Sequence, residues 1–347
     1  MKIQVEAFTV HKRFPLTISR GTTAQSTNVW VRVQHEGIEG WGEGSPFSIG
    51  DCPQTTEAIV HALQQAIPLL ASYSPLEQQA IAPLLQSLPS AAQAAIDTAL
   101  LDWLGKSVGL PLWQLWGLDR EKIGPTSVTI GINPPNIAQQ RVRDWLQLTQ
   151  AQAVKVKLGS PAGVEADRAM LTAVLAEVPA GTKLSVDANG GWTLDEAIQM
   201  SHWLAEQGVT YIEQPMTRGQ ECQLVKLYRQ SPLPIFVDES CFTSRDIPLL
   251  ADRIHGINIK LMKSGGLSEA LRMIHTARAC ELQVMFGCYS DSTLANTAMA
   301  HLSPLADHLD LDSHLNLLDD PFTGAYLQNG CLIPPDLPGL GIKADRQ

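Results

Sequence analysis

Residues 153–159 read AVKVKLG, a short apolar run that carries two lysines. A run this rich in valine is typical of a buried β-strand. Successive side chains along a strand point to opposite faces, so Lys155 and Lys157 project from the same face. There, each ammonium group makes the other harder to keep charged. Taken alone, the stretch fits an edge strand with a solvated face as well as a strand that carries two functional lysines.

The stretch is one of a series. From about residue 125 onward, short apolar segments alternate with helical segments at the interval expected for βα units. We predict strands at SVTIG (127–131), VKVKLG (154–159), KLSVDANG (183–190), YIEQP (211–215), IFVDES (235–240), GINIKLM (256–262), QVMFGCY (283–289) and HLDLDS (308–313). Eight such units predict an α/β fold of the (β/α)8 barrel type.

The N-terminal third has a different pattern. Strand-like segments come first, in FTVHKRFPLTI, NVWVRVQHEG and IEGWGEG, and helical segments follow near 55–71 and 90–106. Strands followed by helices predict an α+β domain over residues 1–117, with the barrel over 118–317. The turn-rich segment 318–347 is too short for another domain, and we expect it to complete the N-terminal one.

The composition limits the partners of the chain. At 347 residues, 44% hydrophobic and 17% charged, it is an ordinary globular protein. Its net charge of −10 argues against nucleic acid or an anionic membrane as a partner. The N-terminus lacks an apolar signal core, and no apolar run approaches the roughly 20 residues of a membrane span. Six cysteines without C-x-x-C spacing indicate free thiols, so we expect a cytoplasmic protein, either a monomer or a homo-oligomer.

Polar side chains gather at the carboxyl ends of the predicted strands, where barrel enzymes build their sites. Those at the ends of the third to sixth strands are Asp187, Asn189, Glu213, Asp238, Glu239 and Lys260. A single acid after a strand fits a helix N-cap equally well. Three acids on three consecutive strands, without His or Cys, instead favour a hard divalent cation such as Mg²⁺.

Two lysines follow the sixth predicted strand, and strand alternation chooses between them. In GINIKLM (256–262), Asn258 and Lys260 share a face, whereas Lys263 falls in the turn before two glycines. We therefore predict that Lys260 faces the site.

These motifs resemble the enolase superfamily, specifically its muconate-lactonizing-like branch. The resemblance rests on K-x-K at 155–157, D-x-N at 187–189, E-Q-P at 213–215, D-E-S at 238–240 and NIKLMKSGG at 258–266, and it covers nearly the whole chain. AAIDTALLDWLGKSVGLPLWQLWG and GWGEGSP resemble parts of the family's capping domain. The resemblance implies a (β/α)7β modified TIM barrel under an α+β cap. The seventh strand, in MFGCYSDS, lacks the histidine base of the mandelate racemase branch.

The resemblance also implies proton transfer next to a carboxylate. A divalent cation, Mg²⁺ with Mn²⁺ as a substitute, would be held by Asp187, Glu213 and Asp238 and would stabilise the resulting enediolate. Supporting roles are implied for Asn189, Glu239 and Asn258.

The base in such a reaction must be a neutral amine. A neighbouring ammonium group and partial burial both lower a lysine pKa. We therefore expect Lys155 to be the charge that conditions Lys157, and Lys157 to be the base. Lys260 would act from the other side of the substrate carbon, as the conjugate acid or second base.

The stretch HLDLDS distinguishes between reactions on this scaffold. Asp310 and Asp312 would share a face at the end of the eighth strand, and two adjacent carboxylates favour an ammonium group. This D-x-D resembles the one that dipeptide epimerases of this branch use for the substrate N-terminus, although a solvated strand end also fits. The first expectation is a Mg²⁺-dependent dipeptide epimerase that inverts the C-terminal α-carbon. The alternatives are o-succinylbenzoate synthase, N-acyl amino acid racemase, muconate cycloisomerase, and a barrel that only binds a metal-chelated amino acid.

Specificity residues are less well marked. Arg20 resembles the arginine that binds the glutamate side chain in Ala-Glu epimerases, if a gap of one residue is allowed in the comparison. An ordinary surface arginine would explain this residue equally well. Tyr289 and Asp291 depart from the family's more frequent Met and Glu and would line the side-chain pocket. Asp51 could favour a cationic side chain. The preferred dipeptide therefore stays open.

Overall fold

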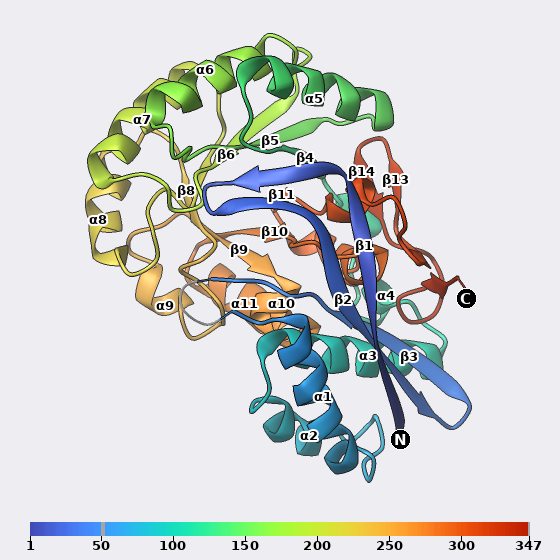
Figure 1. Cartoon of the computed structure of the whole chain (residues 1–347). Helices are drawn as coiled ribbons and strands as arrows, with labels where there is room; N and C mark the ends of the chain where they lie inside the picture. Colours follow the sequence, from blue (N-terminus) through green and yellow to red (C-terminus); the bar gives the residue numbers. More distant parts are fainter. Residues whose placement is uncertain (50–52, 346–347) are drawn as a thin grey trace.

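The computed structural model describes residues 1–49 and 53–345 and combines an antiparallel sheet with a parallel barrel (Figure 1). The sheet consists of β1 (Lys2–Ile18), β2 (Gly21–His35) and β3 (Ile38–Gly44), in that order. Four helices follow, α1 (Thr56–Leu70), α2 (Gln78–Leu85), α3 (Ser90–Val108) and α4 (Leu112–Leu115). We call the β1–β3 sheet with these helices the cap. The predicted helical segments are confirmed as α1 and α3.

Close packing of β3 on α3 holds the cap together. In GWGEG (40–44), every second residue is a glycine and faces the helix. A Cβ on Gly42 would lie 2.0 Å from the carbonyl oxygen of Ala95, so a larger residue would force the strand off the helix. The helix presents small, fully buried alanines to this strand, namely Ala91, Ala95 and Ala99.

The barrel contains eight parallel strands in the order of the chain. They are β4 (Ser127–Ile130), β5 (Ala153–Lys157), β6 (Lys183–Asp187), β7 (Ile212–Glu213), β8 (Ile235–Val237), β9 (Gly256–Lys260), β10 (Gln283–Gly287) and β11 (His308–Leu309). A parallel bridge between Thr126 and Leu309 joins the first strand to the last and closes the barrel.

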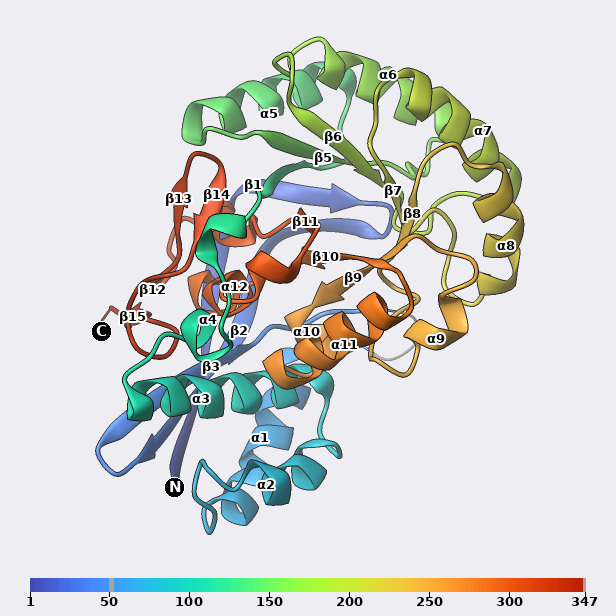
Figure 2. The same ribbon diagram turned by 180° about the vertical axis from the view of Figure 1, so that it is seen from behind.

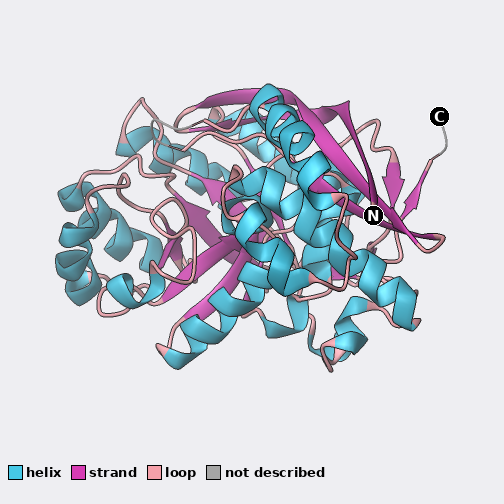
Figure 3. Ribbon diagram, turned by 90° about the horizontal axis from the view of Figure 1, so that it is seen from below, coloured by secondary structure: helices cyan, strands magenta, loops and turns pink. Residues whose placement is uncertain are grey.

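Helices surround these strands on the outside (Figure 3). They are α5 (Pro135–Leu148), α6 (Val164–Leu175), α7 (Leu194–Glu206), α8 (Glu221–Gln230), α9 (Ile247–Leu250), α10 (Leu261–Ser264), α11 (Leu267–Ala279) and α12 (Thr293–Ala300). No α-helix of the described chain follows β11, so the predicted (β/α)7β barrel is confirmed. Several strands are shorter than predicted: β6 ends at Asp187 rather than at residue 190, and β10 ends at Gly287 rather than at residue 289.

The C-terminal segment returns to the cap. It contains the short strands β12 (Phe322–Thr323), β13 (Tyr326–Gln328), β14 (Cys331–Ile333) and β15 (Lys343–Ala344). The ring of Phe322 packs edge-on against Phe8 of β1, with 5.6 Å between centroids. The buried Asp102 carboxylate of α3 accepts a hydrogen bond from the backbone N–H of Leu340 at 2.7 Å. The same segment also contacts the barrel, where the backbone N–H of Thr126 donates to Gly330 at 2.9 Å. The predicted division of the chain at residues 117 and 317 therefore stays a proposal.

The cap reaches over the barrel at two places. Its long β1–β2 hairpin lies across the carboxyl ends of the strands, where Ile132 donates a backbone hydrogen bond to Thr17 at 2.8 Å (Figure 1). On the other side, α3 lies beside α10 and α11 (Figure 2). Within residues 1–49 and 53–345, no helix has the length and apolar character needed to cross a membrane.

Candidate active site

The K-x-K lysines lie inside the barrel. Strand β5 pairs with β4 on one side and β6 on the other, so it is not an edge strand. Lys155 is fully buried and Lys157 is only 7% exposed. The edge-strand interpretation of AVKVKLG is therefore wrong.

Lys155 lies among three carboxylates. Its Nζ is 2.6 Å from Glu213 Oε2, 2.7 Å from Asp310 Oδ2 and 3.5 Å from Asp187 Oδ2. Burial lowers the pKa of Lys155, but the Asp310 and Glu213 carboxylates raise it by more, so the pKa lies well above its usual range. Lys155 is therefore a permanent positive charge beneath the site.

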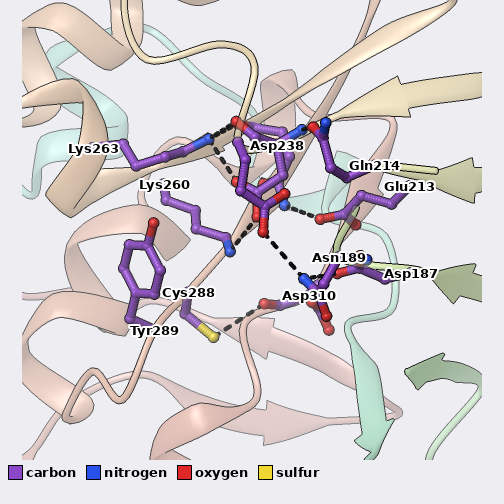
Figure 4. A network of polar contacts seen from close by, with 12 residues as sticks. Asp187, Asn189, Glu213, Gln214, Asp238, Lys260, Lys263, Cys288, Tyr289 and Asp310 are labelled. Carbon is purple, nitrogen blue, oxygen red and sulfur yellow. Dashed lines mark hydrogen bonds and ion pairs between the residues drawn. The ribbon is translucent and has the colours of Figure 1, made fainter. Parts of the chain in front are cut away.

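Lys157 and Lys260 each pair with one carboxylate at the end of a strand. Lys157 Nζ lies 2.6 Å from Asp187 Oδ2. Lys260 Nζ lies 2.7 Å from Asp238 Oδ2 (Figure 4). Because β5 and β9 are four strands apart in an eight-stranded barrel, these lysines approach from opposite sides. Both line one cavity of about 580 Å³ between the cap hairpin and the barrel.

Lys263 points away from that cavity and has a different environment. It is buried, with Nζ 2.6 Å from Asp238 Oδ1 and within 3.1 Å of the backbone carbonyls of Cys241 and Asn258. The single helical turn α10 brings it back beneath Asp238. Sequence reasoning placed Lys263 in a turn and missed this contact.

Three buried carboxylates lie between the two cavity-lining lysines, at the ends of consecutive strands. The pKa of Glu213 is raised to about 7. Burial is the main cause, and the negative charges of Asp187 and Asp238 act in the same direction. In the described part of the chain, no three His, Cys, Asp or Glu side chains are arranged to hold a metal ion. Each of the three carboxylates is instead paired with a lysine, at 2.6 to 2.7 Å. The all-oxygen donor set and the repulsion among three carboxylates fit a hard divalent cation, which would relieve that repulsion.

Two of the three predicted supporting residues, Asn189 and Asn258, hydrogen-bond these carboxylates, and the third, Glu239, contacts Asn189. The backbone N–H of Asn189 donates to Asp187 at 2.8 Å, and Asn258 Nδ2 donates to Glu213 at 2.8 Å. Glu239 accepts a hydrogen bond from Asn189 Nδ2 at 3.3 Å. Gln214 was not predicted, although it follows Glu213 in the E-Q-P motif; its Oε1 accepts the backbone N–H of Asp238 at 2.9 Å.

The two aspartates of the D-x-D share the neighbours Thr129 and Cys288 but differ in their charged partners. Asp310 pairs with Lys155 and accepts a hydrogen bond from the Ser127 hydroxyl at 2.6 Å. Asp312 accepts the backbone N–H of Thr129 at 2.7 Å. Both are buried, and Cys288, which lines the cavity, contacts the Asp310 carbonyl and the Asp312 carboxylate with its thiol, at 3.2 and 3.9 Å.

The predicted specificity residues occupy different places. Arg20 lines the 580 Å³ cavity and an adjoining one of about 1000 Å³, and it pairs with Glu239 at 2.8 Å. Tyr289 lines the smaller cavity. Asp291 is buried and accepts the backbone N–H of Tyr289 at 3.2 Å, which holds the turn. Asp51 lies outside the described residues. Substrate contacts by Arg20, Tyr289 and Asp291 stay predictions.

Lys12 also lines the cavity and was not predicted. It belongs to β1, whose alternate residues Leu16 and Ile18 line the cavity as well. That alternation within HKRFPLTI (11–18) was the available signal.

Fold and site together define a capped barrel enzyme with two lysines on opposite sides of one cavity and three buried carboxylates at the ends of the strands between them. The chain belongs to the mandelate racemase and muconate lactonizing enzyme family of the enolase superfamily, as the resemblance implied. Residues 2–117 match the mandelate racemase / muconate lactonizing enzyme N-terminal domain, and residues 138–347 match the enolase C-terminal domain-like model.

Relatives over the full length are named dipeptide epimerases. The chain is 45% identical to a hydrophobic dipeptide epimerase of a Flavobacteria bacterium, covering 98% of this chain and 97% of the relative. It is 46% identical to a hydrophobic dipeptide epimerase of Roseobacter litoralis, covering 98% of each. Among solved structures, it superposes with a TM-score of 0.91 on a dipeptide epimerase of Enterococcus faecalis complexed with Mg and L-Leu-L-Tyr, at 31% identity over 98% of each chain.

Proposed function

We propose that this protein is a Mg²⁺-dependent dipeptide epimerase that inverts the α-carbon of the C-terminal residue. The observation that carries the proposal is the placement of Lys157 and Lys260 on opposite sides of one cavity, with three carboxylates between them. Epimerisation needs a proton removed from one face of a carbon and another delivered to the opposite face. Two lysines four strands apart meet that requirement.

Each lysine performs one half of the reaction. Lys157 takes the α-proton from one epimer as a neutral amine while Lys260, as an ammonium group, donates a proton to the other face. The reverse reaction exchanges the two roles. Lys155 stays charged throughout and keeps a positive charge beside Lys157.

The carboxylates of Asp187, Glu213 and Asp238 would hold the Mg²⁺ ion. When bound, the ion supplies a Lewis acid that takes up the negative charge developing on the substrate carboxylate. Asn189, Asn258 and Gln214 hold the ligand side chains and backbone in place through the hydrogen bonds described above.

The D-x-D motif favours a dipeptide over the alternative substrates. Asp312 keeps a carboxylate near the cavity wall that is not paired with a lysine, and a peptide α-ammonium group would be its partner. o-Succinylbenzoate synthesis, N-acyl amino acid racemisation and muconate cycloisomerisation supply no such cation. A barrel that only binds an amino acid would not need lysines on both faces.

Dipeptides with hydrophobic side chains are the favoured substrates. The cavity wall includes Leu16, Ile18, Phe47 and Tyr289. Arg20 is neutralised by Glu239, so it does not offer a free charge to an acidic side chain. Close relatives named for hydrophobic dipeptides support this assignment.

The proposal includes the cellular location and the partners of the enzyme. Five cysteines of the described chain are free thiols, which supports a cytoplasmic location. The net charge of −10 supports a small-molecule partner rather than nucleic acid. Assembly into a homo-oligomer stays a prediction.

A panel of substrates in deuterated water tests the proposal. L,L-dipeptides with apolar C-terminal residues, L-Ala-L-Glu and N-succinyl amino acids are incubated with enzyme and Mg²⁺, and deuterium uptake is located by mass spectrometry. We expect uptake at the C-terminal α-carbon, fastest for the apolar dipeptides. Faster exchange of N-succinyl amino acids, or label on the N-terminal residue, would contradict the assignment.

A further inference from the structure

The two cavity-lining lysines have unequal surroundings. Lys260 Nζ lies 4.5 Å from the centre of the Tyr289 ring, over its face, as well as 2.7 Å from Asp238 (Figure 4). No aromatic ring of the described residues faces Lys157 in this way. An ammonium group over an aromatic face is attracted to it, more strongly in a buried site than in water.

The Lys260 side chain passes close to bare backbone before it reaches that ring. Its stem passes over Gly287, the last residue of β10, where an added Cβ would lie 3.0 Å from Lys260 Cε. The same Cβ would lie 2.7 Å from Asn258 Nδ2. Lys260 Cε therefore lies against the backbone of Gly287, and Lys260 Nζ lies over the Tyr289 ring.

The cap fixes the Tyr289 ring. Phe47 stacks on it with 4.7 Å between centroids and 5° between planes. The backbone carbonyl of the next residue, Ser290, accepts a hydrogen bond from Asn28 Nδ2 of β2 at 2.8 Å. Glu43 of β3 accepts the backbone N–H of Ser292 at 3.0 Å. The loop that carries Tyr289 is thus attached to two strands and one loop of the cap.

We propose that Tyr289 is a positioning residue for Lys260: its ring face, held by the cap, fixes the Lys260 ammonium group at the cavity, so one face of the substrate α-carbon depends on Tyr289 and the other does not. This inference rests on the proposed function and goes beyond a wall of the side-chain pocket. The Tyr289 hydroxyl has no hydrogen-bond partner in the described chain, so the ring rather than the hydroxyl carries the role.

The test measures α-proton exchange in deuterated water for each epimer of one dipeptide separately, at saturating substrate. Lys260→Ala first identifies which epimer depends on Lys260. Tyr289→Leu is then expected to slow exchange of that epimer roughly tenfold, the size of a buried cation–π contact, and to leave the other epimer within about twofold. Tyr289→Phe keeps the ring and is expected to preserve the wild-type ratio of the two rates.

Two further variants secure the comparison. Tyr289→Met keeps apolar volume without an aromatic face and should resemble Tyr289→Leu if the latter folds poorly. Tyr326→Leu removes an exposed tyrosine of β13 and should change neither rate. Equal losses for both epimers, or an unchanged ratio in Tyr289→Leu and Tyr289→Met, would overturn the inference while leaving the proposed function intact. Wild-type enzyme that exchanges neither epimer would overturn both.

Discussion

Lys155 and Asp310 form an ion pair of 2.7 Å in the middle of the barrel. The pair joins the second strand of the barrel to the segment after the last strand. It also distinguishes Asp310 from Asp312, the other aspartate of the D-x-D. Asp310 pairs with a buried lysine, whereas Asp312 contacts Thr129 and the Cys288 thiol and forms no ion pair with a lysine of the described chain. The two residues therefore serve different purposes despite their shared motif.

Substitution of the two aspartates should give different phenotypes. Asp312→Asn removes the charge that meets the substrate ammonium group and should reduce kcat/KM for dipeptides by roughly ten- to a hundredfold. N-succinyl amino acids, which have no ammonium group there, should lose far less. Asp310→Asn instead removes a partner of Lys155 and should reduce the free energy of unfolding by about 1–3 kcal/mol. Steady-state kinetics and urea denaturation measure the two effects; equal losses for both substrate kinds in Asp312→Asn would contradict this assignment.

Substrate binding should depend on pH through Asp312. Burial raises the pKa of Asp312 to about 6, and the negative charge of Asp310 raises it in the same direction, while hydrogen bonds from Thr129 and the positive charge of Lys155 oppose the shift. Below that pH the carboxyl is protonated and uncharged, so KM for a dipeptide should rise as pH falls through about 6 and stay level above it. KM between pH 5 and 7.5 measures this, because the substrate ammonium group, with a pKa of about 8, stays charged over most of the range. Asp312→Asn should flatten the profile; an unchanged profile would assign it to another group.

Substitution of each of the three lysines near Asp187 and Asp238 should have a different effect on α-proton exchange. Lys157→Ala should block α-proton exchange of one epimer and Lys260→Ala that of the other, and both should abolish net epimerisation. Lys263→Met should instead lower the melting temperature, since it removes a buried partner of Asp238, and leave the ratio of the two exchange rates unchanged. Wild-type epimerisation in Lys260→Ala together with an inactive but folded Lys263 variant would reverse the roles of these two lysines.

Removal of divalent metal should abolish turnover, and Mg²⁺ should restore it. Asp187→Asn, Glu213→Gln and Asp238→Asn should each weaken Mg²⁺ binding in isothermal titration calorimetry, since each removes a charged oxygen ligand. Circular dichroism should show an intact barrel in these variants. Full activity after exhaustive EDTA treatment would rule out the metal site.

The packing of β3 on α3 predicts a large effect from one methyl group. Gly42→Ala places a Cβ against the Ala95 carbonyl and should cost about 1–3 kcal/mol of unfolding free energy. Gly124→Ala is the matched control, because its Cβ would meet nothing within 4 Å, and its unfolding free energy should stay within about 1 kcal/mol of wild type. Equal midpoints of urea denaturation for the two variants would contradict this account of the cap.

The sequence predicted much of this molecule because its signals are local. Runs such as SVTIG and GINIKLM are apolar and short, and the carboxyl ends of parallel strands must meet at one end of a barrel. That rule predicted that Asp187, Glu213 and Asp238 lie at the carboxyl ends of three neighbouring strands, as they do. The role of Lys263 was not predictable in this way, because the helical turn α10 reverses its direction back to Asp238. The separation of Asp310 from Asp312 was also missed: strand alternation was extended over 308–313, whereas β11 ends at Leu309.

The contact between Asp102 and Leu340 has a consequence for how the molecule folds. During synthesis, every barrel strand is complete before Leu340 leaves the ribosome, and until then α3 lacks that partner for its buried carboxylate. Contacts this distant along the chain form late, because a long loop must close before they stabilise anything. The contact of α3 with the C-terminal segment therefore completes the cap only after every barrel strand has been synthesised, although the β1–β2 hairpin that lies over the cavity is made first.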